Sequence, residues 1–294
     1  MKIFSAKKLI VFTLIAGFVA GVIPASAFTR IVKASEGLGQ VGVKDLALED
    51  IAILPNNPFH FMIGFSNSIK GFFISNPVRE ASFKLEISGR NAGELRKLLD
   101  WVPDNTVALS TSLALYESSL IDFGTKLRSL KASDLGEGAE KTLNKMTGRL
   151  LTQVLFVDDI RDSFTSSADK ATLEAISDML EIDLRFIGEK LDRPESFGDR
   201  IVNLMTERAD AAITVRAAEI LPRLVSEISV GEAAQSLKRS ILAARQTLIT
   251  NLIQAMQDES KALTQTETEG PTIIELIDQL AGEVLKAEIY ALLR

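Results

Sequence analysis

The chain has 294 residues, a formal net charge of −6 and no cysteine. Without cysteine it forms no disulfide, no thiolate nucleophile and no cysteine-based metal site. Lys and Arg are interspersed with Asp and Glu along the whole chain, so no basic patch is available for phosphates and we expect no nucleic-acid partner. The length allows one large helical domain or two smaller ones.

Residues 1–27 have the three parts of a secretion signal. Three lysines precede an uncharged run over residues 9–23, and the segment ends in the small residues Ala25-Ser26-Ala27. The apolar run is shorter than the roughly 20 residues of a membrane-spanning helix, so we expect cleavage after Ala27 and export of the remainder. With no cysteine for lipid attachment, nothing then anchors the chain stably to the membrane. An uncleaved N-terminal anchor is the alternative.

Residues 28–50 form a flexible lead in this interpretation. They contain Gly37-Leu38-Gly39-Gln40-Val41-Gly42, which formally matches the glycine pattern of dinucleotide-binding turns. Such a turn must follow a strand and open a helix within a βαβ unit. Here it lies shortly after the secretion signal and precedes a proline-interrupted apolar segment. We therefore expect a linker and no bound cofactor.

Residues 51–263 are predicted to form a helical domain. Asn57-Pro58 and Asn76-Pro77 each place a capping residue before a proline, which is typical of helix starts and predicts helices over about 58–73 and 77–101. Pro222 is expected to kink or break its helix. Apolar residues at helical spacing predict the remaining helices, over about 106–131, 143–157, 173–191, 201–220 and 237–256.

The predicted helix over 58–73 is apolar over more than half of its circumference and has Lys70 as its single charge. Such a helix is either enclosed by other helices or seated on a membrane or a partner. We favour enclosure, because an interfacial helix usually has a strongly charged face. Its aromatic residues form the first part of a candidate interaction surface: Phe59, Phe61, Phe65, Phe72 and Phe73.

The C-terminal part begins with a polar linker over residues 264–271. Thr272 and Glu275 then have the spacing of a capping box, which predicts a final amphipathic helix over 272–294. An apolar helix at this place must dock on the bundle or on a second copy. Its apolar stripe forms the second part of the candidate interaction surface: Ile273, Ile277, Leu280 and Val284.

Strand-like alternation of polar and apolar residues is not evident in the sequence. The predicted fold class is therefore all-α. We expect antiparallel helical hairpins in a bundle, which the sequence allows to be elongated, with the separately linked C-terminal helix added to it.

One stretch resembles a known family. Leu54-Pro55-Asn56-Asn57-Pro58-Phe59-His60-Phe61 is followed by Phe72-Phe73-Ile74-Ser75-Asn76-Pro77 and a long charged helix. This order is similar to exported bacterial helical proteins that share an L-P-x-x-P-[FY]-x-[FL] domain of unknown function. The resemblance covers about residues 44–131, and with it the first part of the helical domain, 51–131. It implies export and helical structure, and it supplies no activity, cofactor or site residue.

His60 is the single histidine of the chain. A catalytic Ser-His-Asp or Cys-His system needs partners that the sequence does not mark, and a zinc site would have to combine one histidine with carboxylates only. We therefore expect a packing histidine. The G-x-S-x-G, phosphate-loop and H-E-x-x-H motifs are absent as well. The sequence predicts no enzyme, with no catalytic residue, cofactor or metal.

Acidic residues gather at two places in the predicted helices. Asp158 and Asp162 are one helical turn apart beside Arg161, so we expect a solvated helix face. A calcium loop would need alternating oxygen ligands and a glycine turn. Glu181 and Asp183 receive the same interpretation, as solvated side chains.

The favoured function is a structural or interaction module of the cell envelope or exterior, which binds an unknown protein partner or itself. The first alternative is an extracytoplasmic sensory or regulatory module, which requires an uncleaved N-terminal segment to transmit across the membrane. The second is a membrane-surface or lipid-binding protein that uses the phenylalanine-rich helix. A hydrolase comes last.

Overall fold

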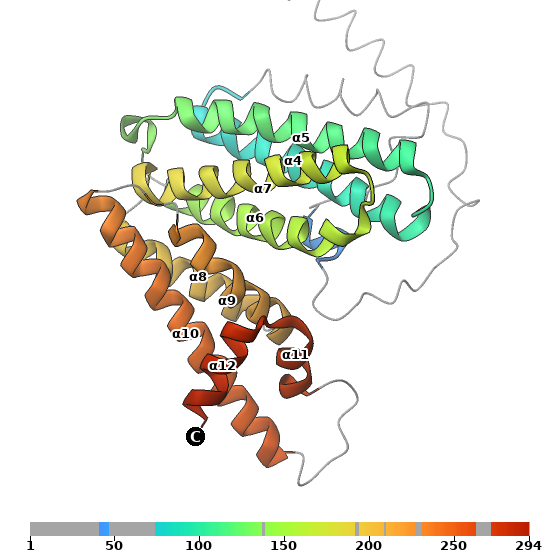
Figure 1. Ribbon diagram of the computed structural model, residues 1–294. Helices are drawn as coiled ribbons and strands as arrows, with labels where there is room; N and C mark the ends of the chain where they lie inside the picture. The colour runs from blue at the N-terminus through green and yellow to red at the C-terminus, as the bar shows by residue number, and fades with distance from the viewer. Residues whose placement is uncertain are drawn as a thin grey trace, which may run out of the picture. The chain divides into compact units, whose positions relative to one another are not determined.

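The computed structural model describes residues 41–46, 74–136, 139–191, 194–208, 210–226, 228, 231–262 and 272–293. Within these ranges the chain forms ten α-helices and no strand, and neighbouring helices pack antiparallel (Figure 1). The predicted all-α fold class is confirmed. The secretion signal at 1–27 and the predicted helix over 58–73 lie outside the described residues. Within the ranges given, no helix combines the length and the apolar character needed to cross a membrane.

Two long helices, α4 (Pro77–Trp101) and α5 (Thr106–Ser129), form an antiparallel hairpin. The helix α4 begins where the sequence predicts, because the Asn76 side chain accepts a hydrogen bond from the Arg79 amide at 3.0 Å. Asn105 caps α5 in the same way, accepting from the Ala108 amide at 3.1 Å. Short polar side chains at both starts thus satisfy amides that have no partner within the helix.

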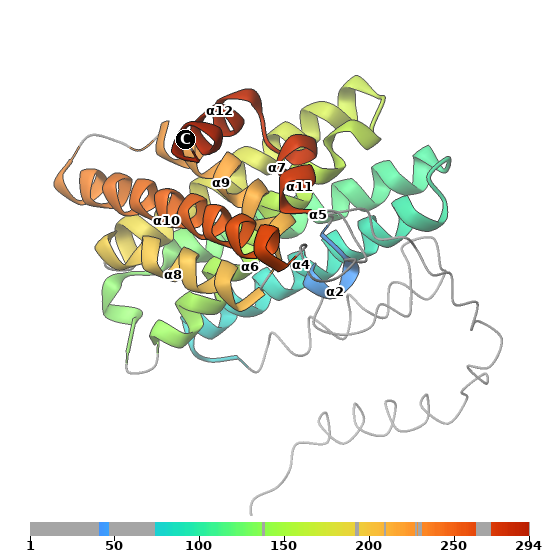
Figure 2. The same ribbon diagram turned by 90° about the horizontal axis from the view of Figure 1, so that it is seen from below.

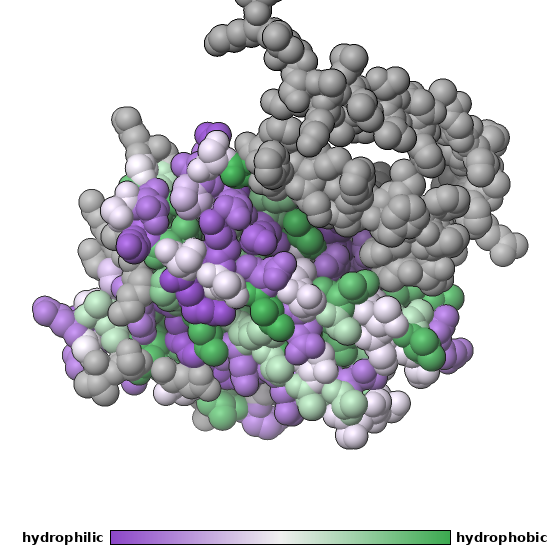
Figure 3. All heavy atoms as spheres, turned by 90° about the horizontal axis from the view of Figure 1, so that it is seen from above, coloured by the Kyte–Doolittle hydropathy of each residue, from purple (hydrophilic) through white to green (hydrophobic). Residues whose placement is uncertain are grey.

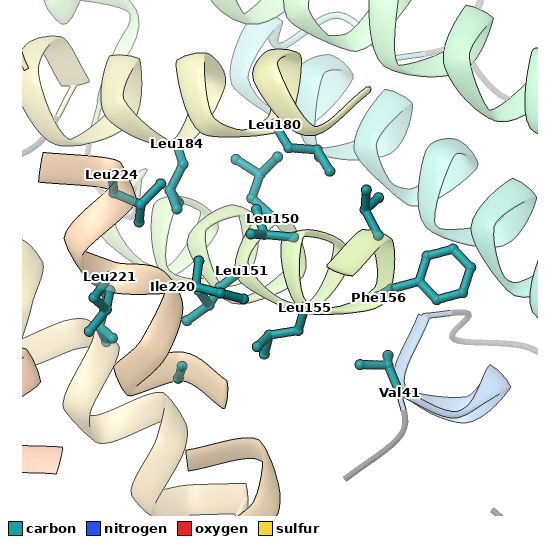
Figure 4. Packing of buried hydrophobic residues seen from close by; sticks show 14 of the residues in the cluster. Val41, Leu150, Leu151, Leu155, Phe156, Leu180, Leu184, Ile220, Leu221 and Leu224 are labelled. Atoms are coloured by element: carbon teal, nitrogen blue, oxygen red, sulfur yellow. The ribbon is translucent and has the colours of Figure 1, made fainter. Parts of the chain in front are cut away.

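A second hairpin packs on the first. It consists of α6 (Ala139–Ile160) and α7 (Ser167–Phe186), with α6 against α4 and α7 against α5. The helix α6 is central, since every residue from 150 to 157 is buried. Figure 4 shows Leu150, Leu155 and Phe156 pointing to different sides of α6, towards residues of α7 and α9 among others. The short turns are the 3-10 segments Ala132–Asp134 and Arg161–Ser163 and the π segment Ile187–Leu191.

Three further helices follow, α8 (Pro194–Arg208), α9 (Ala211–Ser226) and α10 (Glu232–Ala262). We expected one helix over 201–220 with a break at Pro222, and this is wrong. The break falls between α8 and α9, where one oxygen of Asp210 accepts hydrogen bonds from the amides of Ala212 and Ile213 at 2.9 and 3.1 Å.

Pro222 lies inside α9, which continues to Ser226. Proline has no N–H, so the carbonyl of Ala218, four residues earlier, lacks its helical donor. The Arg245 side chain on α10 supplies one: its Nε donates to the Ala218 oxygen at 3.0 Å. The helix therefore passes through the proline with that carbonyl satisfied.

The C-terminal segment is two helices, α11 (Ile273–Leu280) and α12 (Glu283–Leu292), instead of the single helix expected over 272–294. The predicted capping box is confirmed, with Glu275 N–Thr272 Oγ1 at 3.2 Å and Thr272 N–Glu275 Oε2 at 2.8 Å. The helical structure is interrupted before Gly282, which is the N-cap of α12. The Glu219 carboxylate of α9 lies close to this position and accepts a hydrogen bond from the Gly282 amide at 3.4 Å.

Part of the expected flexible lead is packed. Residues 41–46 contain the short helix α2 (Val43–Leu46), which lies against α4 and α6 (Figure 2). Val41 and Leu46 are buried in the core. The Leu46 carbonyl oxygen would lie 2.5 Å from a Cβ at Gly89 of α4, so the glycine allows this close approach. The expectation of a flexible segment over 28–50 is therefore wrong for 41–46, and the remainder lies outside the described residues.

Candidate interaction surface

The structure separates the residues of the predicted interaction surface. The five phenylalanines, from Phe59 to Phe73, lie outside the described residues, as does His60. Of the C-terminal stripe, Ile277 is fully buried, whereas Ile273 and Leu280 are half-buried. Val284 is 78% exposed. The expected stripe is thus divided between the core and the surface.

The break at Gly282 explains this division. In one continuous helix, Ile277 and Val284 would share a face because they are seven residues apart. In the structure α11 buries Leu276 and Ile277, and α12 starts in a new direction and buries Leu285 and Ile289. Leu285 and Ile289, which are four residues apart, are therefore the residues that pack α12 against the rest of the described structure.

The outward side of α12 is also apolar. Val284, Ala287 and Ala291 are spaced three and four residues apart and all are exposed, and Leu292 beside them is 53% exposed. We call these four residues the α12 surface. A surface helix normally has one apolar stripe that faces the core and a polar side that faces water. Because α12 exposes these apolar residues in addition to the ones it buries, they are candidates for a contact with another molecule.

Polar contacts fix α12 in place. Glu288, one turn from both Val284 and Leu292, pairs with Arg245 of α10 at 2.7 Å. The Tyr290 hydroxyl donates to Asp278 of α11 at 2.8 Å, which ties the two short helices together. That hydrogen bond raises the pKa of Tyr290, because it stabilises the protonated phenol. These contacts hold α12 against α10 and α11 in the described structure.

The turn between α4 and α5 carries a second exposed apolar pair that the sequence analysis did not single out. Trp101 is 52% exposed and Val107 is 76% exposed. The Lys97 ammonium lies 4.3 Å from the centre of the Trp101 ring, a cation–π distance. The one available signal was that Trp101, the only tryptophan of the chain, stands next to the predicted helix end. On the face in Figure 3, hydrophobic residues are interspersed with hydrophilic ones.

An open cavity of about 540 Å³ lies among α8, α9, α10 and α11. Its apolar side chains include Met205, Leu248, Leu252 and Ile273, the first residue of α11. Among the described residues of its lining, Asp210 is the one charged residue, and its carboxylate caps α9. The docking of α11 therefore supplies one wall of this cavity.

The acidic side chains of α7 contradict the sequence interpretation. Glu181 and Asp183 were expected to be solvated, yet both are buried. The reason is that α5 and α9 each direct an arginine to this helix. Arg128 pairs with Asp183, and Arg223 pairs with Glu181 at 3.1 Å. Burial raises the pKa of Asp183 to about 7, and the positive charge of Arg128 only partly opposes this shift.

The acidic residues at the end of α6 are divided in a similar way. Asp162 is exposed, as expected, and Asp158 is partly exposed but pairs with Arg223 at 3.4 Å instead of Arg161. The neighbouring Asp159, with 3% of its side chain exposed, bonds to Arg96 of α4 at 3.1 Å and to Arg216 of α9 at 2.9 Å.

These ion pairs link helices that are far apart in the sequence. Asp159 connects α4, α6 and α9, and Arg223 connects α6, α7 and α9. In the described part of the chain, no group of three or more His, Cys, Asp or Glu side chains is arranged to hold a metal ion. The network is a set of structural contacts between helices.

Comparisons with protein families, curated proteins and solved structures find no match. The class that the structure defines is an all-α protein of antiparallel helices. The resemblance to exported helical proteins stays a prediction.

Proposed function

We propose that this is an exported, non-catalytic helical protein of the cell envelope or exterior, and that it binds a protein partner or a second copy of itself. The observation that carries the proposal is the α12 surface: it is exposed and apolar, and it lies on a helix that Arg245 holds through Glu288. Contiguous exposed apolar residues are typical of protein contacts. The signal-like composition of residues 1–27 supports the location.

The contact test replaces the two largest side chains of the α12 surface. Val284→Ser with Leu292→Ser removes exposed apolar area and leaves Leu285 and Ile289, which dock the helix, unchanged. We expect the double variant to keep its helical circular dichroism and to lose at least about tenfold in association, equivalent to about 1.4 kcal/mol. The matched control is Val107→Ser, an equally exposed valine at the α4–α5 turn.

Association is measured by chemical cross-linking in intact cells of the source organism, followed by purification of the full chain. A cross-linked species that persists in the Val284→Ser, Leu292→Ser variant, or that disappears equally in Val107→Ser, contradicts the α12 surface as the contact. Sequencing the N-terminus of the same purified protein tests export. We expect Phe28 as the first residue, and an intact Met1 favours the retained sensory alternative instead.

A further inference from the structure

The two C-terminal helices are joined to the rest of the described structure by a small number of side chains. The apolar contacts come from five buried residues and from the half-buried Ile273 and Leu280. The buried ones are Leu276, Ile277, Ala281, Leu285 and Ile289. On the polar side, the Gly282 amide donates to Glu219 of α9 at 3.4 Å. The second polar contact is the pair formed by Glu288 and Arg245. We call α11 and α12 together the C-terminal hairpin.

The C-terminal hairpin is one unit by its internal contacts. Tyr290 of α12 donates to Asp278 of α11 at 2.8 Å. The helices have eight and ten residues, lengths at which an isolated helix is marginal in water. Their helical structure therefore depends on docking against α9 and α10. A unit with few buried side chains opens at a lower free energy than the whole molecule unfolds.

Arg245 has two partners on two different elements. Its Nε donates to the Ala218 carbonyl in α9, and its terminal nitrogen pairs with Glu288 of α12. Only 14% of the Arg245 side chain is exposed. The Ala218 carbonyl needs this donor because Pro222 cannot provide one. The same guanidinium thus supports α9 at its proline and holds the hairpin.

We propose that the C-terminal hairpin is a latch that opens from α9 and α10 as a unit, and that Arg245 couples its docking to the stability of α9 around Pro222. When the latch opens, Arg245 loses the carboxylate of Glu288 and keeps the Ala218 carbonyl, so its guanidinium is no longer held between α9 and α12. Opening also removes Ile273 from the wall of the cavity among α8, α9 and α10. The proposal requires no binding partner, so it stands apart from the proposed function.

The first test is hydrogen exchange on the full chain under native conditions, read by mass spectrometry. We expect amides of residues 273–292 to exchange together and at least about tenfold faster than those of α6, because a local opening exposes them without global unfolding. If residues 273–292 exchange only at the rate of the buried residues 150–157, the hairpin does not open separately and the proposal is wrong.

The coupling is tested with three variants. Arg245→Gln removes the contacts with Ala218 and Glu288. We expect exchange to rise at least about tenfold in residues 283–292 and in 219–226, which corresponds to the loss of a hydrogen bond to a charged group. Glu288→Gln removes only the ion pair, so exchange is expected to rise in the hairpin and, by a smaller factor through Arg245, in residues 219–226. In Pro222→Ala with Arg245→Gln, the new alanine amide can donate to Ala218, and residues 219–226 regain protection while 283–292 remain fast.

Two results overturn the coupling. One is that Arg245→Gln leaves residues 219–226 unchanged, and the other is that the added Pro222→Ala does not restore them. Circular dichroism of each variant establishes that α4 to α7 remain folded. If Arg245→Gln does not fold, Glu288→Gln decides: exchange in residues 219–226 must rise together with that in 283–292, and unchanged exchange in 219–226 contradicts the coupling.

Discussion

The carboxylate of Asp183 on α7 is buried against the guanidinium of Arg128 on α5. The pair lies over Gly124, where a side chain would come within 2.8 Å of both groups. The second oxygen of Asp183 is buried without a hydrogen bond. A charged carboxylate in these surroundings is only partly compensated, which is the physical reason for its raised pKa.

This pair predicts how stability depends on pH. The pKa of Asp183 is about 7 in the folded chain and 3.8 as the ordinary value, so the folded state binds the proton more tightly. The contribution of Asp183 to stability is therefore complete below about pH 4 and is lost as the pH rises through 7. Between pH 5 and 8, we expect Asp183→Asn to lose less unfolding free energy than the wild type.

Urea unfolding at the two pH values measures this difference, which at about 1.4 kcal/mol per pKa unit amounts to a few kcal/mol at most. Asp162→Asn is the matched control, because Asp162 is exposed. It should show the pH dependence of the wild type. An Asp183→Asn variant with the same pH dependence as the wild type contradicts the raised pKa of Asp183.

The buried carboxylate of Asp159 gives a second prediction. Asp159→Ala removes the carboxylate that pairs with Arg216, whose side chain is 16% exposed, whereas Arg96 keeps its pair with Asp100 at 3.3 Å. Breaking such a pair from one side costs about 3–5 kcal/mol, because a buried charge stays uncompensated. Thermal or urea unfolding measures the loss. For the exposed Asp162, replacement by alanine should change stability by no more than about 0.5 kcal/mol. Equal effects at both positions would count against a buried network.

A third prediction concerns the close approach of α8 and α10. Gly198 donates its amide to the Ser240 hydroxyl at 2.7 Å, and a Cβ there would collide with the backbone carbonyl of Ser240. Gly198→Ala should destabilise the fold by about 1–3 kcal/mol in urea unfolding, since backbone has to move to make room. Gly136→Ala is the control, because nothing lies within 4 Å of a Cβ at that position. A stabilised Gly198→Ala variant would falsify the close packing.

The sequence was sufficient to predict helix starts that depend only on neighbouring residues. The start of α4 at Asn76 and the capping box of Thr272 and Glu275 both depend on residues within three positions. The continuation of α9 through Pro222 depends on Arg245, which lies 27 residues from Ala218. The spacing of apolar residues within one segment does not indicate a hydrogen-bond partner on another helix.

The candidate interaction surface shows the same limit. Helical spacing predicted that Ile277 and Val284 share a face, which holds only if the helix is continuous. The break at Gly282 fits the approach of Glu219, which is 63 residues away in the chain. Likewise, the acidic side chain of Asp183 is typical of a solvated face, and its burial follows from Arg128 on another helix. In both cases the contact is with a charged residue far away in the sequence, Glu219 for Gly282 and Arg128 for Asp183.

The central claim is that this chain acts through contacts of the α12 surface. The most direct measurement places a photo-reactive amino acid at position 284 in the full chain and irradiates intact cells of the source organism, with the same substitution at position 107 as control. The account predicts one dominant cross-linked species from position 284, either a partner or a second copy, and a yield at least about tenfold lower from position 107. Equal yields from the two positions, or no cross-linked species from position 284, would contradict it.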